Sequence, residues 1–229
     1  LGKWENLKAG HGTGFYADAS VNYLSDRFGI ELSFAKHLQK LYPGEKIALI
    51  KYSRSGSSID SSAARWFGSW EADFKGGQGV NQYDHFLSTI RHASDTRDID
   101  GDGINDYFKP CGIIWMQGES DALDEAVALR YHANLKRLMD LIRAALREDN
   151  VPVVIGKISD SGDDKDGKVW DFGELVQYAQ EKYAITDKRA AIVRSTQNYK
   201  YSDPYHYNSA GYIDLGIRFA EAVYRLNKK

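Results

Sequence analysis

The chain has 229 residues, a formal net charge of −2 and 42% hydrophobic residues, which fits a single α/β domain with a sizeable core. The near-balanced charge argues against nucleic acid or an anionic membrane as the main partner, and no apolar run reaches the length that spans a bilayer. Cys111 is the single cysteine, which excludes an internal disulfide and a cysteine-based zinc cluster. Beside the apolar residues 112–115, we expect Cys111 to be a small core residue rather than a nucleophile.

Helical and strand patterns alternate along the first half of the chain. Apolar residues recur at helical spacing over 31–41, and the Pro-Gly pair that follows predicts the end of this helix. Residues 46–52 (KIALIKY) form a short apolar run typical of a buried strand, and they lead into the small-residue turn 53–58. A second helix is predicted over residues 82–93.

The same alternation continues to the end of the chain. Three more apolar runs predict strands, and three amphipathic stretches predict helices. The strands cover 111–116, 151–158 and 190–194, and the helices cover 121–148, 172–183 and the segment after 208. This order predicts a three-layer α/β sandwich, in which helices flank a central parallel sheet within a single domain over residues 1–229.

Three polar turns follow predicted strands, at 53–58, 117–121 and 202–206. In a parallel sheet the ligand site lies outside the carboxyl ends of the strands, so we expect these turns to converge. The last turn contains Asp203 and His206. A carboxylate that holds one imidazole nitrogen leaves the other to take a proton from a hydroxyl nucleophile, which is two thirds of a hydrolytic triad. The alternative is a polar loop that caps the last helix.

An acidic loop at residues 98–106 follows most of the pattern of an EF-hand calcium loop. Its candidate ligands are Asp98, Asp100, Asp102, Ile104 and Asp106, with Ile104 at the position where that loop uses a backbone carbonyl. Lys109 stands where an EF-hand has its bidentate glutamate. We expect a structural calcium ion here, and the alternative is a solvated acidic turn.

With these turns in view, the chain resembles the SGNH hydrolase superfamily, with its flavodoxin-like fold. It is most similar to the branch of sialate O-acetylesterases and acetylxylan esterases, carbohydrate esterase family 6. Four segments carry the resemblance, which spans residues 28–227. They are FGIELSFA at 28–35, with Ile30 where the family has proline, the strand and glycine turn at 47–58, WMQGESD at 115–121, and DPYH at 203–206.

The resemblance implies removal of O-acetyl groups from a sugar through a serine acyl-enzyme, with no metal in the chemistry. His206 would be the general base and then the acid, and Asp203 would hold its tautomer. The backbone N–H of Gly56 and the side-chain amide of Gln117 would donate to the oxyanion. Glu119 would be a buried support rather than a reacting acid.

One part of the family pattern has no counterpart in these residues. The family's nucleophile lies in a G-Q-S-N block after its first strand, and the only G-Q pair here, at 77–78, is followed by glycine. We therefore expect the domain to be incomplete at its N-terminus, with the first strand and the nucleophilic serine upstream of Leu1. The alternative nucleophiles within the chain are the serines of the 53–58 turn, Ser53, Ser55, Ser57 and Ser58.

The expected substrate is an acetylated polysaccharide or sugar, with Trp66 and Trp70 as candidate sugar platforms or, alternatively, packing residues. An enzyme of this kind is expected outside the cell or in the periplasm. The rival function is a non-catalytic carbohydrate-binding or scaffolding module built on an esterase fold. A lipase- or thioesterase-like enzyme is disfavoured by WMQGESD, because those branches of the superfamily carry a different block at this place.

Overall fold

A parallel sheet lies at the centre of the computed structural model, which describes residues 4–10, 27–77 and 79–228. Its strands are β1 (Ile113–Trp115), β2 (Val153–Gly156) and β3 (Ala190–Val193), in the order β1-β2-β3. Ile113 pairs with Val153, and Val153 pairs with Ala190. The central strand β2 is buried at every position, as expected for a parallel strand covered on both faces.

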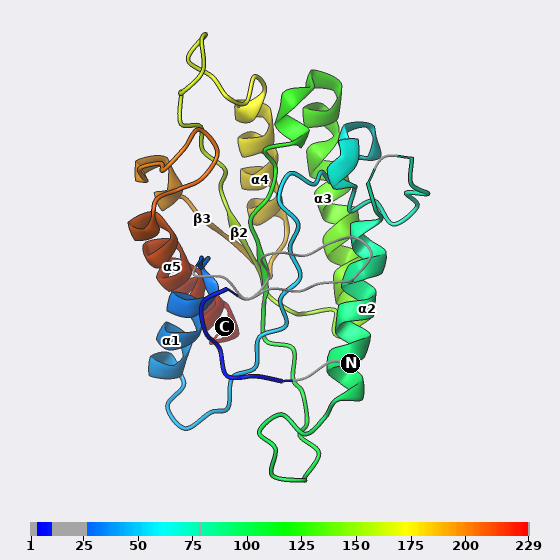
Figure 1. The fold of residues 1–229 in the computed structure, drawn as a ribbon, viewed down its shortest axis with the longest axis vertical. Coiled ribbons are helices and arrows are strands. Elements are labelled where there is room, and N and C mark those ends of the chain that lie inside the picture. Colours follow the sequence, from blue (N-terminus) through cyan, green and yellow to red (C-terminus); the bar gives the residue numbers. More distant parts are fainter. Residues whose placement is uncertain (1–3, 11–26, 78, 229) are drawn as a thin grey trace.

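Helices cover both faces of the sheet (Figure 1). Helices α1 (Glu31–Leu41) and α5 (Ser209–Asn227) pack on one face, where the side chain of Val154 joins their core. Helices α3 (Glu125–Leu146) and α4 (Gly173–Thr186) pack on the other face, against Val153 and Ile155. This alternation of neighbouring side chains between two cores follows from the period of two in a strand. Helix α2 (Gln82–Asp95) adds Tyr83 to the second core, and the Tyr83 hydroxyl donates to the carbonyl of Leu141 in α3 over 3.1 Å.

Short polar side chains set the starts of three helices. Asn81, Asp124 and Asn208 precede α2, α3 and α5, and each accepts a hydrogen bond from a backbone N–H of the first turn. Short 3₁₀ turns complete the fold at Ser61–Ala63, Arg65–Phe67, Asp121–Leu123 and Ser195–Asn198. Among the helices described, none combines the length and apolar character that crossing a bilayer requires.

The predicted α/β class and its flanking helices are confirmed, but the predicted strand at 46–52 is wrong. This segment is extended, yet within the described ranges no strand pairs with it. The side chain of Ile50 is 42% exposed as a result. An apolar run becomes a strand only where a neighbouring strand supplies its hydrogen bonds, and here a groove separates the segment from β1.

This groove, of about 2840 Å³, runs between residues 46–52 and the edge of β1 that does not face β2. Cys111, predicted to be a core residue, is exposed and lines it instead, because the residues just before β1 have a packed neighbour on one side only. Trp70 is buried in the core and is no sugar platform, whereas Trp66 is 67% exposed.

Candidate active site

The three polar turns predicted from the sequence converge at one end of the groove. Gly56, Gln117, Asp203 and His206 all line it, and Glu119 lies among them. They come from the segment after 46–52, from the turn after β1 and from the loop after β3. The carboxyl ends of neighbouring parallel elements therefore meet here, as the α/β order requires.

The pairing of Asp203 with His206 is formed in the structure. The Nδ1 atom of His206 lies 2.8 Å and 2.9 Å from the two carboxylate oxygens of Asp203. The backbone N–H groups of Tyr205 and His206 also donate to Asp203, each over 2.8 Å. The N–H of Tyr205, the His206 side chain and its N–H together hold the pKa of Asp203 below its usual value. An ionised Asp203 fixes Nδ1 as the protonated nitrogen, so Nε2 is the atom that can accept a proton.

A buried carboxylate that received no role from the sequence joins the other two turns. Asp121 is fully buried and accepts hydrogen bonds from the backbone N–H groups of Ile59 and Asp60 and from the side-chain amide of Gln117. Burial raises the pKa of Asp121 to about 6, although these donors oppose the shift. The signal in the sequence was the final Asp of WMQGESD. Its carboxylate draws the glycine turn and the 117–121 turn together.

Gly56 occupies a position that only glycine fits. Its φ is +74°, in the left-handed region, and a Cβ atom there would lie 2.8 Å from Cγ of Phe67. Its carbonyl accepts a hydrogen bond of 2.8 Å from the hydroxyl of Ser120. The predicted oxyanion donor therefore lies in a turn that the WMQGESD segment holds in place.

Both amide hydrogens of Gln117 are engaged within the protein. Its Nε2 donates to the carbonyl of Ser57 over 3.1 Å and to Asp121 over 2.6 Å, and its Oε1 accepts from the Tyr131 hydroxyl. In this arrangement Gln117 orients the glycine turn. To act as an oxyanion donor, as the sequence predicts, it would have to exchange one of these bonds for the substrate.

Glu119 faces the groove from the same turn. Its side chain is partly buried, not fully buried as predicted. Desolvation raises its pKa, while the backbone N–H groups of Glu119 and Gly118 and then the nearby His206 lower it. Its role as a support rather than a reacting acid stays a prediction.

Two of the four alternative serines have structural roles. The Ser57 hydroxyl donates to the carbonyl of Arg54 and accepts from the indole N–H of Trp70. Ser58 is fully buried and donates to the carbonyl of Asp60. Ser53 and Ser55 remain as nucleophile candidates within the chain, because both are exposed and line the groove.

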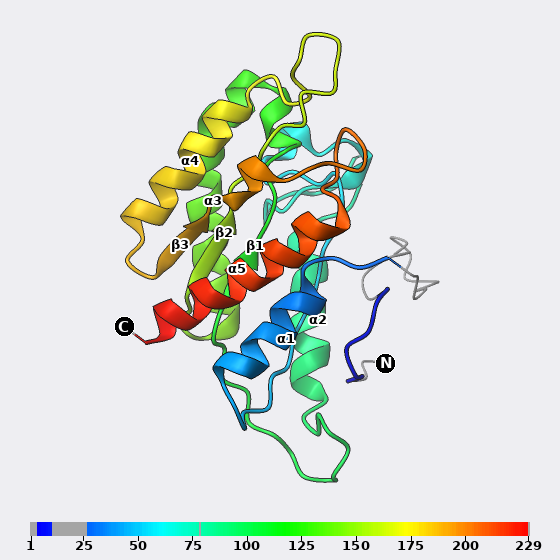
Figure 2. The same ribbon diagram turned by 90° about the vertical axis from the view of Figure 1, so that its left-hand side faces the viewer.

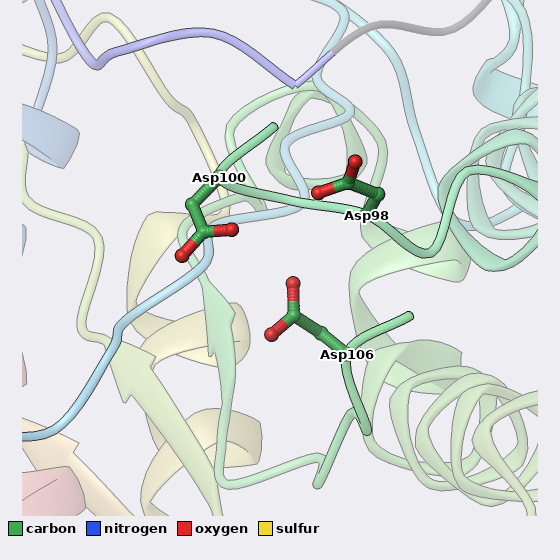
Figure 3. Close-up of side chains that lie close together, drawn as sticks. All are labelled: Asp98, Asp100 and Asp106. Atoms are coloured by element: carbon green, nitrogen blue, oxygen red, sulfur yellow. The ribbon is translucent and has the colours of Figure 1, made fainter. Parts of the chain in front are cut away.

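The acidic loop brings three of its predicted ligands together (Figure 3), and one of them, Asp106, lines the groove. One carboxylate oxygen from each of Asp98, Asp100 and Asp106 lies within 4.8 Å of the others. Asp102 lies outside this group and accepts a hydrogen bond from its neighbour's backbone, the N–H of Ile104, over 2.8 Å. Lys46 forms an ion pair with Asp100, which holds the pKa of that carboxyl below its usual value.

The structure thus combines an α/β sandwich with an Asp-His pair at the carboxyl edge of its sheet, and the comparisons with known proteins give its family. Residues 4–225 match the family described as "Carbohydrate esterase, sialic acid-specific acetylesterase", and the chain belongs to this family. No curated protein matches the chain.

Two solved structures are similar in fold. A protein from Arabidopsis thaliana has a TM-score of 0.66 and 20% identity, over 91% of this chain and 75% of that protein. A carbohydrate acetylesterase from Xanthomonas citri has a TM-score of 0.58 and 19% identity, over 89% of this chain and 41% of that protein. The chain thus spans less than half of the Xanthomonas enzyme.

Proposed function

We propose that this protein is a carbohydrate O-acetylesterase that works through a serine acyl-enzyme. The observation that carries this proposal is the hydrogen-bonded pair of Asp203 and His206 at the mouth of a groove. Nε2 of His206 would take the proton of the serine hydroxyl as its oxygen attacks the acetyl carbonyl. The same nitrogen would then protonate the departing sugar oxygen, and a water molecule would release acetate in the second half of the cycle.

The nucleophilic serine, in this proposal, lies on a strand upstream of the 229 residues, and this strand fills the groove. Apolar side chains from both helical layers line the space. They include Phe34, Leu38 and Val223 from one layer, and Trp70, Phe86 and Ile142 from the other. Ile113 directs its backbone N–H to the carbonyl of Pro152, so strand alternation turns that of Ile114 toward the groove.

Such an occupant is expected to be continuously apolar, because parallel strands covered on both faces have this composition. A strand parallel to β1 would end beside Gly56 and His206. The residue just after it would then reach the imidazole, which is the place the mechanism needs for the serine.

The proposed substrate is an acetylated polysaccharide or sugar. The family description supports it, and so do two exposed aromatic residues, Trp66 and Tyr205, which are 67% and 60% exposed. Flat aromatic faces of this kind stack on sugar rings. Because polysaccharides do not cross membranes, we further propose that the protein acts outside the cell or in the periplasm.

The test is acetate release from 4-nitrophenyl acetate and acetylated xylan. The chain as printed is compared with its His206→Ala variant, and so is a version of the chain extended by whatever segment its gene encodes upstream. His92→Ala, which changes an exposed histidine of α2, is the matched control. We expect turnover that depends on His206 in the extended chain and none in the printed chain.

The other possible results would indicate a different nucleophile or a different function. Turnover by the printed chain would place the nucleophile within it, and Ser53→Ala and Ser55→Ala would then identify the serine. If both folded versions bind acetylated xylan and release no acetate, the protein is a carbohydrate-binding module. Trp66→Ala would test whether the exposed indole contributes to that binding.

A further inference from the structure

The turn that carries Asp203 and His206 is exposed, and its own hydrogen bonds, at the tip through Asp203 and at the base, fix only its internal shape. Tyr201 and Tyr207 form an antiparallel bridge, and the N–H of Ser202 donates to the carbonyl of His206 over 2.9 Å. Both catalytic side chains are about half exposed, at 46% for Asp203 and 51% for His206. Their orientation relative to the sheet must therefore come from contacts outside the turn.

Ser159, just after β2, holds the base of this turn. Its Oγ lies 2.7 Å from the Tyr201 hydroxyl and 2.8 Å from the Tyr207 hydroxyl, and it donates to the carbonyl of Thr196 over 3.1 Å. A serine hydroxyl has one donor and two acceptor positions. Because the Ser159 hydroxyl donates its one hydrogen to Thr196, both tyrosine hydroxyls must donate to Ser159. The donor and both acceptor positions of the Ser159 hydroxyl are then occupied.

Ser161 holds the tip of the turn. Its hydroxyl donates to the carbonyl of Pro204, the residue that follows Asp203, over 2.8 Å. Nearby, the ring of Trp170 packs on that of Tyr205 with centroids 5.8 Å apart. Asp160 fixes this arrangement by accepting hydrogen bonds from the N–H groups of Val169 and Trp170. Figure 2 shows the loop that follows β2 and the loop that carries His206 at the same end of the molecule.

The segment after β2 is also linked to the 117–121 turn. The N–H of Ile158 donates to the side chain of Gln180, which in turn donates to the backbone carbonyl of Gln117. Gln180 is fully buried. The two halves of the site are thus attached to the same short segment, residues 158–161.

We propose that Ser159 and Ser161 are positioning residues, which set the orientation of the Asp203 and His206 pair through hydrogen bonds to the turn that carries it. This inference rests on the proposed function, because orientation matters to catalysis only if His206 is the base. The two serines hold Nε2 of His206 toward the groove and do not touch the substrate themselves. Their loss is expected to lower kcat and to leave KM unchanged.

Hydrogen exchange of backbone amides tests the inference in the chain as printed, without any need for activity. The amides of Tyr205 and His206 report on the turn because both donate to Asp203. In Ser161→Ala we expect their exchange to accelerate about fivefold, the effect of losing one ordinary hydrogen bond. The amides of α3 and α5 should exchange as in the wild type. Ser161→Thr keeps the hydroxyl and should restore the original rates.

Ser88→Ala, which changes an exposed serine of α2, is the matched control and should leave the turn unchanged. Ser159→Ala provides a second measurement at the base of the turn and should also accelerate exchange at Tyr205 and His206. Unchanged exchange at these amides in both Ser161→Ala and Ser159→Ala would overturn the inference, and so would an equal acceleration throughout the sheet. If the turn loosens as expected but no version of the protein releases acetate, the esterase proposal fails. The conclusion that Ser159 and Ser161 hold the turn would still be supported.

Discussion

Two aspartates at the same end of the sheet have opposite environments. Asp121 is fully buried, and burial raises its pKa to about 6. Asp203 is exposed, and the N–H groups and imidazole around it lower its pKa. Both accept two backbone N–H groups and one side-chain donor, so the difference lies in solvent access and not in the number of partners.

The comparison separates a residue that holds the site together from one that is proposed to serve the chemistry. Asp121 joins two turns of the site, and its loss is expected to weaken the fold. Asp203 orients one imidazole at the surface, and its loss is expected to weaken catalysis. Variants at these two positions should therefore separate an effect on catalysis from an effect on stability.

The largest effect is expected for Asp203→Asn in the acetate-releasing form of the protein. An amide in place of the carboxylate no longer selects the productive tautomer of His206, so kcat should fall about 10³- to 10⁴-fold. The free energy of unfolding should change by less than about 1 kcal/mol, because the pair is exposed. Steady-state kinetics measure kcat, and urea unfolding measures the free energy of unfolding. A large loss of stability with intact activity would reverse the assignment.

Asp121→Ala is expected to act on stability instead. It leaves the buried N–H groups of Ile59 and Asp60 without their acceptor, which should lower the free energy of unfolding by about 3 to 5 kcal/mol. Urea unfolding at pH 7 measures this loss. Asp149→Ala, which changes an exposed aspartate after α3, is the control and should unfold like the wild type.

The raised pKa of Asp121 has its own signature in pH. The folded state binds a proton more tightly than the unfolded state, whose ordinary value is 3.8. The associated stability is therefore fully present below pH 4 and is lost as the pH rises through about 6, a change of about 3 kcal/mol. Asp121→Asn cannot titrate, so its stability deficit relative to the wild type should shrink between pH 4 and pH 7. A constant deficit would show that the carboxyl is ionised throughout.

The acidic loop offers a third environment, in which Asp98, Asp100 and Asp106 crowd together at the surface. If calcium neutralises them, EDTA should lower the melting temperature, by the equivalent of about 1 kcal/mol at a calcium concentration about tenfold above Kd. Asp100→Ala should abolish this response. If EDTA lowers the melting temperature of Asp100→Ala equally, or does not change that of the wild type, the calcium prediction is wrong. Lys46 would then be the cation that balances the charge of the cluster.

The sequence predicted well wherever local pattern and connectivity suffice. The helix at Glu31–Leu41 has the predicted bounds, and the strands at 113–115, 153–156 and 190–193 lie within the predicted runs. The convergence of Gly56, Gln117 and His206 was also predictable, because parallel strands place their carboxyl ends at one edge. The 203–206 pattern even gave the pairing of Asp203 with His206.

The failures share one cause, which is dependence on a distant partner. Residues 46–52 have the composition of a buried strand, but within the described parts of the chain no strand pairs with them, so they remain extended and none of them is fully buried. Cys111 looked like a core residue by its neighbours, yet it lines the groove. In each case the local sequence favours a strand or a core position. Whether the residue takes it depends on which segment packs against it, and the local sequence does not contain that information.

By itself, then, the sequence determined the α/β order, the approximate positions of the helices and the residue types at the three turns, because periodicity and capping are local properties. Only the tertiary structure decided that Asp121 joins two of these turns, that the amide of Gln117 is already engaged, and that Ser161 bonds Pro204 across 43 positions of the chain. Hydrogen bonds between distant segments depend on the relative placement of whole elements. That placement is set by how the two helical layers pack on the sheet, and no local pattern records it.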